Sequence, residues 1–233
     1  MANVLSNIRI SSDCYILTVG GQFEGRMGQF YMVRGWELYP LLSRPLSIYD
    51  LNETGISFLY RVVGKGTQRL ADLRRGDRVE LNGPLGNGFP EIGGRVALVG
   101  GGLGAAPLYF AARQLPESTA YLGFSREAIA DEPFRSRCAE VVVKIGGSIV
   151  DEIDPSRFDA VFVCGPPAML QAMTRKAHRS GAALYVSAES RMACGVGACL
   201  VCSCPTTDGN RRVCADGPVF SGEEVLWDEW DHV

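Results

Sequence analysis

The stretch Cys194-Gly-Val-Gly-Ala-Cys199-Leu-Val-Cys202, followed by Cys214, contains four cysteines at spacings of x4, x2 and x11. A C-x4-C-x2-C run with a more distant fourth cysteine is the plant-type pattern for a [2Fe-2S] cluster. Four thiolates must converge on two irons, so the chain between the first two ligands has to wrap tightly around an inorganic core. The stretch therefore predicts an iron–sulfur site with these four cysteines as ligands.

The residues between the cysteines agree with this interpretation. Gly195 and Gly197 permit backbone conformations that a residue with a Cβ resists, and they let amide N–H groups approach the sulfides. A structural zinc site more often has two C-x2-C pairs, and a disulfide framework is typical of small secreted domains. Cys204 lies close enough to replace a neighbouring ligand, but the x4 and x2 spacings favour the first set.

The composition is that of an ordinary globular protein, with 46% hydrophobic and 21% charged residues among 233. The net charge of −3 argues against nucleic acid or an anionic membrane surface as the main partner. No apolar run reaches the roughly 18 residues that span a bilayer, and we expect no signal peptide. The other cysteines (Cys14, Cys138 and Cys164) are scattered, so we expect a reducing, cytoplasmic setting.

Residues 1–92 read as short strands separated by turns. Apolar or alternating runs occur at 4–10, 15–19, 29–33, 56–63 and 77–81. Many short strands with Gly and Asn turns predict a small antiparallel barrel.

Two segments within this barrel have the chemistry of phosphate binding. Arg44-Pro-Leu-Ser47 offers a guanidinium fork that suits a pyrophosphate, at a point where Pro45 fixes the backbone. The run Gly64-Lys-Gly66-Thr67 is a glycine turn before a short amphipathic helix at 68–73, whose first N–H groups can face an anion. Each segment alone is a weak signal, because most Arg-Pro pairs are strand entrances and most Gly-x-Gly runs are turns.

From residue 93 to 185 the pattern changes to strands alternating with helices. Buried strands are expected at 95–99, 119–124, 140–145 and 160–164, with helices at 105–113 and 167–178. This alternation predicts a parallel sheet that helices cover on both faces.

Two loops of this domain lie where such a sheet binds a dinucleotide. The first strand is followed by Gly100-Gly-Gly-Leu-Gly104, which departs from the G-x-G-x-x-G fingerprint, and another ends in Cys164-Gly-Pro-Pro167. Cys164 can equally be a small apolar residue that ends a strand. Ser125-Arg126 can contact an adenosine ribose or a 2′-phosphate, or form an ordinary solvated loop, so NAD and NADP both remain possible.

The order of the two barrel segments resembles the ferredoxin–NADP reductase superfamily, which binds FAD with an Arg-x-x-Ser segment and then a Gly-x-x-Thr-like segment. The resemblance implies that Arg44 and Thr67 contact the FAD phosphates. It places these further residues in the FAD site: Pro45, Leu46, Ser47, Ile48, Tyr60, Val62, Gly64 and Gly66. It places the following residues in the NAD site: Gly102, Gly104, Cys164, Gly165 and Pro166.

The cluster segment is more specific. Glu189-Ser-Arg-Met-Ala-Cys-Gly-Val-Gly-Ala-Cys199, with Cys214-Ala-Asp-Gly-Pro-Val-Phe220, resembles the electron-transfer subunits of class 1B dihydroorotate dehydrogenases. The resemblance covers the whole chain: a flavin-binding barrel at 1–92, an NAD domain at 93–185 and a small [2Fe-2S] domain at 186–233, an α+β multi-domain fold. The x11 spacing before Cys214 is short for this family.

This resemblance implies that the chain transfers electrons. It also implies that the chain contributes no catalytic residue for the oxidation of dihydroorotate. The expected partner is an FMN-containing catalytic subunit, in a heterotetramer with two copies of each chain. Electrons would pass from that FMN through the [2Fe-2S] cluster and FAD to NAD+, in pyrimidine biosynthesis. The alternatives are a reductase subunit that serves a hydrogenase or a ferredoxin, and an iron–sulfur sensor that keeps a degenerate flavin fold.

Overall fold

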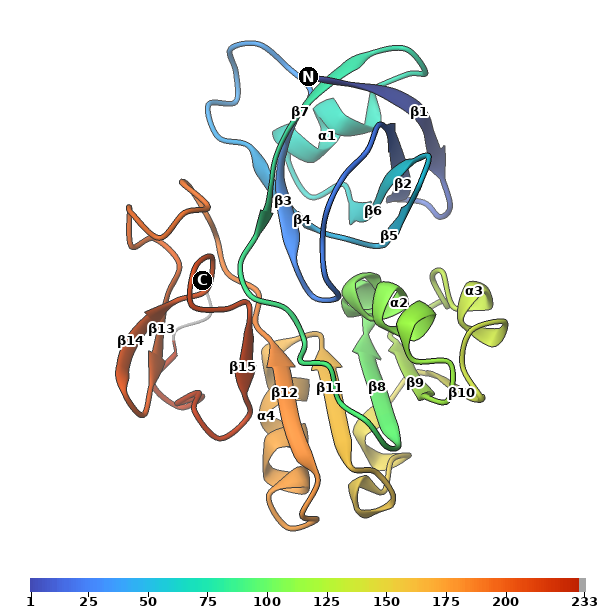
Figure 1. Cartoon of the computed structure of the whole chain (residues 1–233), viewed down its shortest axis with the longest axis vertical. Coiled ribbons are helices and arrows are strands. Elements are labelled where there is room, and N and C mark those ends of the chain that lie inside the picture. The colour runs from blue at the N-terminus through green and yellow to red at the C-terminus, as the bar shows by residue number, and fades with distance from the viewer. Residues whose placement is uncertain (231–233) are drawn as a thin grey trace.

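Seven short strands in the first third of the chain form one antiparallel sheet. They are β1 (Ala2–Arg9), β2 (Cys14–Gly20), β3 (Phe30–Arg34), β4 (Arg44–Ser47), β5 (Asp50–Asn52), β6 (Gly55–Arg61) and β7 (Arg78–Leu85). Their order in the computed structural model is β4-β3-β7-β1-β2-β6-β5 (Figure 1). The N–H of Tyr49, just after β4, donates to the carbonyl of Ser57 in β6 over 2.9 Å, so the two ends of the sheet meet and a barrel closes.

Apolar side chains fill the barrel because alternate residues of each strand point inward. Leu17, Tyr31 and Phe58 are buried there, and Tyr31 and Phe58 pack edge to face with ring centroids 6.0 Å apart. Helix α1 (Lys65–Ala71) connects β6 to β7. The Asn7 side chain donates to the carbonyls of Leu70 (2.8 Å) and Leu73 (3.2 Å), which attaches the end of this helix to β1.

The second third forms a sheet with helices on both faces, as the alternating pattern predicts. Its strands are β8 (Val96–Gly101), β9 (Thr119–Phe124), β10 (Glu140–Ile145), β11 (Ala160–Cys164) and β12 (Ala183–Ser187), with β15 (Val219–Ser221) at one edge. Its helices and turns are η1 (Gly102–Gly104), α2 (Ala105–Gln114), α3 (Glu132–Arg135), η2 (Ile149–Asp151), η3 (Pro155–Arg157) and α4 (Pro167–Ala177). The order β10-β9-β8-β11-β12-β15 is parallel except for β15.

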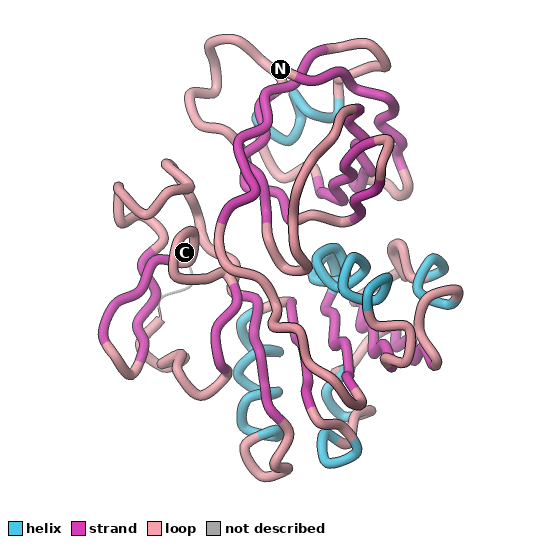
Figure 2. Tube along the Cα trace, in the orientation of Figure 1, coloured by secondary structure: helices cyan, strands magenta, loops and turns pink. Residues whose placement is uncertain are grey.

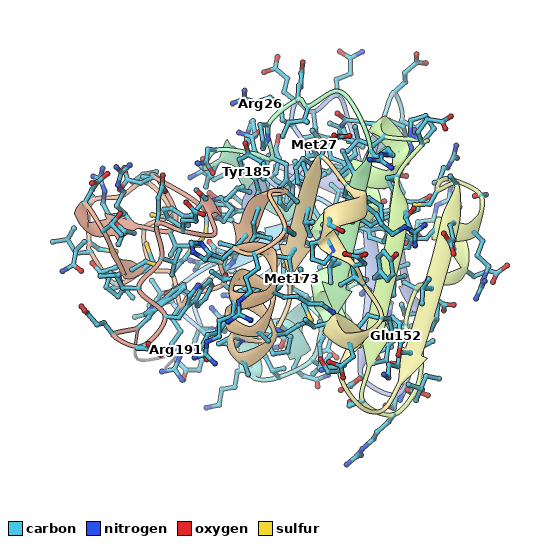
Figure 3. The ribbon with its side chains drawn as sticks, turned by 90° about the horizontal axis from the view of Figure 1, so that it is seen from below. Arg26, Met27, Glu152, Met173, Tyr185 and Arg191 are labelled. Carbon is cyan, nitrogen blue, oxygen red and sulfur yellow. The ribbon has the colours of Figure 1, made fainter. Side chains whose placement is uncertain are left out.

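The two faces of this sheet pack against different helices. Phe162 lies in the same apolar cluster as the buried face of α2, whereas Val161 and Val163 lie in the cluster that contains Leu170 and Met173 of α4. Neighbouring residues of a strand point to opposite faces, so this division follows from the alternation. Met173, labelled near α4 in Figure 3, is fully buried in this second cluster. Burial on both faces explains why β11 is apolar throughout.

The cluster segment is attached to both preceding units. Strand β15 pairs antiparallel with β12, and the hairpin of β13 (Ser203–Thr206) and β14 (Gly209–Arg212) lies beside them (Figures 1 and 2). The Asn87 side chain donates to the carbonyls of Asp216 (3.0 Å) and Val219 (2.9 Å) and accepts from the Val219 N–H. We propose 92/93 and 185/186 as domain boundaries on the sequence pattern, with β15 joining the neighbouring sheet.

The structure describes residues 1–230, and the last residues of the predicted cluster domain, 231–233, lie outside the described range. The predicted strands and helices of the first two thirds are confirmed, with shifts at their ends, such as β7, which continues to Leu85. The strands β5, β12 and β13–β15 were not predicted. All of these except β12 have only three or four residues, which are too few to show an alternation. None of the helices in the described range combines the length and apolar character of a bilayer-spanning segment.

Candidate functional site: two nucleotide cavities and a four-cysteine loop

The two barrel segments predicted to bind FAD meet in space. Arg44 begins β4, Gly66 lies in the first turn of α1, and a Cβ built on Gly66 would sit 2.3 Å from Arg44 Nε. The Arg44 guanidinium also lies 5.7 Å from the centre of the Trp36 ring. The Thr67 hydroxyl accepts from the N–H groups of Val63 (2.9 Å) and Gly64 (3.2 Å), which shapes the turn before α1. These residues form a cationic, glycine-lined corner that suits a pyrophosphate.

The other residues predicted for the FAD site differ in accessibility, and Leu46 is buried. Pro45, Ser47 and Val62 are half-buried at the surface of the barrel. Ile48 and Tyr60 face the barrel interior, where the Tyr60 hydroxyl donates to Asn7 Oδ1 over 3.1 Å. In this structure they support the site from inside and do not line it.

A second cavity lies beside Gly64. It has a volume of about 610 Å³ and is lined by Tyr39, Pro40, Val62, Val63, Gly64, Lys65, Gln68, Arg69 and Asp72. The Lys65 ammonium lies 5.2 Å from the centre of the Tyr39 ring, so the loop after β3 reaches the start of α1.

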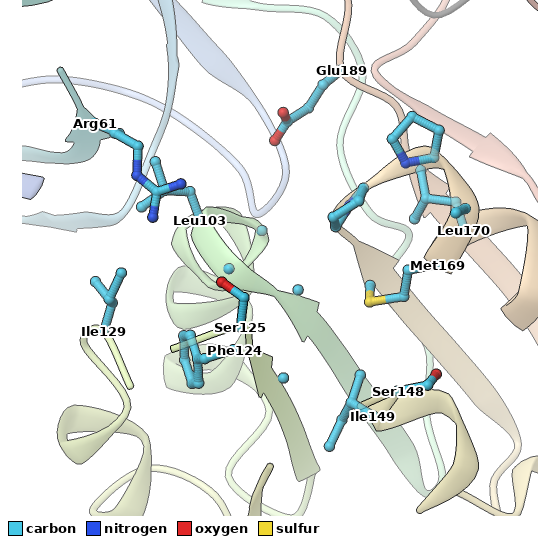
Figure 4. Close-up of a pocket in the computed structure, with 18 of the residues that line it drawn as sticks. Arg61, Leu103, Phe124, Ser125, Ile129, Ser148, Ile149, Met169, Leu170 and Glu189 are labelled. Carbon is cyan, nitrogen blue, oxygen red and sulfur yellow. The ribbon is translucent and has the colours of Figure 1, made fainter. Parts of the chain in front are cut away.

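A cavity of about 930 Å³ opens at the carboxyl ends of β8, β9 and β11 (Figure 4). The predicted NAD residues Gly102, Gly104, Gly165 and Pro166 line it. Gly102 has a φ of +56°, and a Cβ on Gly104 would sit 2.1 Å from the Cys164 carbonyl oxygen. Both positions therefore need glycine, the first for its backbone conformation and the second for the close approach of two loops. The glycine turn departs from G-x-G-x-x-G, and it lies between the end of β8 and the start of α2, where a dinucleotide is expected to bind.

Cys164 lies just behind the lining of this cavity. It is buried at the end of β11, and its Sγ lies 3.8 Å from Glu189 Oε1. Burial, and then the Glu189 carboxylate, raise the pKa of the Cys164 thiol well above its usual value. Cys164 is therefore a neutral thiol that donates to Glu189. Glu189 itself is an exposed residue that lines the cavity, and the protein around its carboxylate raises its pKa by desolvation.

The barrel supplies Arg61 to the same cavity, a residue that the sequence patterns did not single out. Arg61 ends β6, and its Nε lies 3.1 Å from Asp13 Oδ2. Figure 4 shows its guanidinium extending toward the side of the cavity that carries Ser125 and Leu103. Ser125 and Arg126, which the sequence left between a ribose contact and a solvated loop, also line the cavity.

Two tryptophans of the C-terminal segment line the cavity as well. Trp227 and Trp230 have ring centroids 5.8 Å apart, and the intervening Asp228 accepts from Gln171 of α4 over 2.7 Å. The sequence shows two tryptophans in an acidic tail but gives no sign that the tail returns to the nucleotide domain.

The four predicted cluster ligands lie together as two pairs. The N–H of Val196, followed by the backbone and side chain of Cys199, lowers the pKa of Cys194 to about 6. Burial raises the pKa of Cys214 to about 12, and its neighbour Cys202 adds to this. Within residues 1–230, no three Cys, His, Asp or Glu side chains converge on the position of a single ion. Two irons with two thiolates each fit two adjacent pairs of thiols.

The backbone around these sulfurs is arranged as a cluster requires. The N–H of Val196 donates to Cys194 Sγ (3.4 Å), and that of Gly197 to Cys214 Sγ (3.1 Å). Gly195 and Gly197 have φ values of +74° and +79°, so both glycines are needed for the loop conformation. N–H groups directed at sulfur are the donors that tune an iron–sulfur cluster.

Cys204 has a different environment. It is fully buried on β13, its Sγ lies 3.8 Å from the Pro205 carbonyl oxygen, and burial raises its pKa to about 12. It belongs to the apolar core under the hairpin.

Comparison with known proteins agrees with this arrangement. Residues 189–226 match the model of the iron–sulfur cluster binding domain of dihydroorotate dehydrogenase B. The chain is 42% identical to the dihydroorotate dehydrogenase B (NAD(+)) electron transfer subunit of Clostridium acetobutylicum, over 96% of this chain and 95% of the relative. It is 39% identical to the subunit of the same name from Caldanaerobacter subterraneus, over 97% of this chain and 98% of the relative.

Solved structures show the same architecture. A chain from the structure of an NADH-dependent reduced ferredoxin-NADP oxidoreductase, studied for flavin-based electron bifurcation, superposes with a TM-score of 0.89. It is 30% identical, over 98% of this chain and 91% of that one. The ferredoxin reductase of carbazole 1,9a-dioxygenase shares the fold at 20% identity and a TM-score of 0.67, over 78% and 65% of the two chains. The full-length similarity to the curated subunits, together with the matched cluster domain, shows that this chain belongs to the family of dihydroorotate dehydrogenase B (NAD(+)) electron transfer subunits.

Proposed function

We propose that this chain carries electrons from the FMN of a catalytic dihydroorotate dehydrogenase subunit, through a [2Fe-2S] cluster and FAD, to NAD+ in pyrimidine biosynthesis. The observation that carries the proposal is the shared 930 Å³ cavity, which Arg61 of the barrel, Gly102 of the nucleotide domain and Glu189 before the cluster loop line together. Bound FAD exchanges two electrons with a nicotinamide and single electrons with a cluster, so it connects the two kinds of carrier.

The residues of the barrel hold FAD by charge and shape. Arg44 binds and orients its pyrophosphate at the start of α1, and Gly66 leaves room for the Arg44 guanidinium. Thr67 holds the turn at this point, because its buried hydroxyl accepts from the Val63 N–H and donates to the Gly64 carbonyl. Ser47 and Val62 offer their half-buried surfaces to the ring system, and Ile48 and Tyr60 keep that wall rigid from inside. The 610 Å³ cavity beside Gly64 extends this site along α1.

The large cavity accommodates the dinucleotide. The glycine turn from Gly102 to Gly104 faces its pyrophosphate, and Arg61 meets the phosphates from the barrel side. Gly165 and Pro166 shape the nicotinamide end, with Cys164 behind them as a neutral thiol that holds its proton toward Glu189. The family name favours NAD+ over NADP+ as the acceptor.

Cys194, Cys199, Cys202 and Cys214 hold the cluster in an accessible loop, because Cys199 is exposed while Cys202 and Cys214 are buried. We place the catalytic partner at this exposed side, in a heterotetramer with two copies of each chain. We also propose a cytoplasmic location, since all eight cysteines are unpaired and a thiolate-bound cluster needs a reducing compartment.

Co-purification with a candidate catalytic subunit tests the proposal. We expect a stable complex that contains FMN, FAD and two irons per electron-transfer chain, and that reduces NAD+ with dihydroorotate. A chain that holds FAD and iron but ignores the dihydroorotate dehydrogenase subunit would refute the pathway and leave the electron-transfer chemistry standing.

A second candidate, a reductase subunit that serves a ferredoxin or a hydrogenase, has a specific observation in its favour. The 30%-identical structural relative comes from a ferredoxin-NADP oxidoreductase and matches the chain at both ends. Supplying reduced ferredoxin to the purified chain in place of dihydroorotate and its subunit separates the two, because only this second candidate then reduces NAD+ or NADP+.

A further inference from the structure

A charged pair lies directly behind the cluster loop. Arg212, the last residue of β14, donates from Nε to Asp216 Oδ2 and from Nη2 to Asp216 Oδ1, each over 2.8 Å. The backbone N–H of Arg212 donates to the same carboxylate over 2.8 Å. The Asp216 N–H returns a bond to the Arg212 carbonyl over 2.7 Å. A guanidinium held by two parallel bonds has little freedom to turn.

The remaining arm of Arg212 reaches the cluster loop. Its Nη1 donates to the Gly197 carbonyl over 3.3 Å, and the N–H of the same Gly197 donates to Cys214 Sγ over 3.1 Å. A Cβ on Gly197 would sit 2.9 Å from the Ala215 Cβ, so the loop and the turn after β14 are in close contact. Gly197 is thus held between the Arg212 fork and the sulfur of a cluster ligand.

Such an N–H bond matters most when the cluster is reduced. The added electron places more negative charge on the sulfurs, and an N–H directed at sulfur stabilises that charge and raises the reduction potential. Asp216 neutralises the guanidinium, so Arg212 acts on the cluster mainly by orienting Gly197. Neither residue contacts the 930 Å³ cavity.

We propose that Arg212, fixed by Asp216, is a positioning residue that directs the Gly197 N–H at Cys214 and thereby raises the reduction potential of the [2Fe-2S] cluster. The proposal rests on the proposed function, because it takes Cys214 as a cluster ligand. It assigns a role to the Asp-Gly-Pro-Val-Phe run, whose first residue is Asp216.

Two substitutions separate orientation from simple charge. Arg212→Gln removes the guanidinium, so the potential falls whether Arg212 acts by charge or by orientation. Asp216→Asn breaks the fork but leaves an unneutralised guanidinium near the cluster. If orientation dominates, Asp216→Asn lowers the potential, whereas a pure charge effect would raise it. Arg211→Gln is the matched control, because Arg211 is the preceding residue of β14 and pairs instead with Asp208 at 3.2 Å.

The measurement is a redox titration of the purified complex, followed by the electron paramagnetic resonance of the reduced cluster, with iron and FAD content determined in parallel. We expect both Arg212→Gln and Asp216→Asn to make one-electron reduction about tenfold less favourable, a fall of about 59 mV. Arg211→Gln should leave the potential unchanged. Coupling of an exchangeable proton to the reduced cluster should weaken in the same two variants.

An unchanged or higher potential in Asp216→Asn would overturn the proposal. If Arg212→Gln loses its iron, Arg212→Lys takes its place, since lysine keeps the charge but cannot form the fork. We expect the reduction potential of Arg212→Lys to fall by the same amount, and an unchanged potential in this variant would also contradict the proposal. A wild-type complex without iron would instead refute the ligand set, so failure of this inference and failure of the proposed function are distinguishable.

Discussion

The Arg44 guanidinium occupies the space that a side chain on Gly66 would fill. A Cβ at position 66 would sit 2.3 Å from Arg44 Nε and 2.4 Å from Cζ, although the two residues come from different segments of the barrel. The contact joins the Arg-x-x-Ser segment to the glycine turn and concentrates the positive charge at the start of α1.

Gly66→Ala should therefore weaken FAD binding without unfolding the barrel. The guanidinium is the mobile end of a long side chain, so the new methyl group displaces it from the turn and leaves the backbone in place. Loss of one charge-assisted contact predicts an FAD affinity at least about tenfold lower. The flavin-to-protein ratio after purification and an FAD titration of the apoprotein measure this. Gly93→Ala, where a Cβ meets no atom within 4 Å, is the control.

Two cysteine substitutions test the ligand set. Cys199→Ser should abolish the cluster absorbance and transfer to the partner, while FAD content and NADH oxidation with an artificial dye persist. Cys204→Ser should keep the cluster and lower the free energy of unfolding by about 1–3 kcal/mol, because it places a hydroxyl in an apolar core. Iron analysis and thermal unfolding distinguish them. Normal iron content in Cys199→Ser would show that another residue is the ligand.

Arg61→Gln should weaken dinucleotide binding with little effect on FAD content. The guanidinium extends into the large cavity from the barrel, and its charge-assisted bonds to phosphate should be worth about a tenfold change in affinity. Binding of NADH and of ADP-ribose should weaken equally, because both contain the pyrophosphate. Arg95→Gln is the control, since Arg95 lies near Asp159 at the opposite end of β8. Equal ADP-ribose binding by wild type and Arg61→Gln would contradict the assignment.

Glu189→Gln should change how stability depends on pH. The pKa of Glu189 is higher in the folded protein, so the folded state loses stability as pH rises from the unfolded value of about 4.3 through the folded one. Glutamine cannot ionise and escapes this loss. The difference in melting temperature between the variant and wild type should therefore be more positive at pH 8 than at pH 4. Glu53→Gln, in the exposed turn between β5 and β6, controls for the removal of a carboxyl group.

Features that depend on a few neighbouring residues were predictable from the amino-acid order. The x4 and x2 spacing around Cys199 predicted the cluster domain whose family model residues 189–226 match, and the glycines before Ala105 predicted a dinucleotide turn. Strands such as β11 were recognisable because burial on both faces requires an unbroken apolar run. Each of these features depends on the geometry of about ten neighbouring residues, so one continuous stretch of sequence is enough to recognise it.

The completion of the sites depends on contacts that local patterns do not contain. Arg61 belongs to a barrel strand yet lines the dinucleotide cavity, and Glu189 meets Cys164 across 25 positions. Asn87 holds Val219 across 132 positions, and β15 joins a sheet whose other strands end at Ser187. These contacts arise because the units of the fold pack together to bury apolar surface. The way in which the units face each other then decides which partner each polar side chain meets. Sequence order thus determined the cofactor-binding segments, and packing decided which charged residues face them.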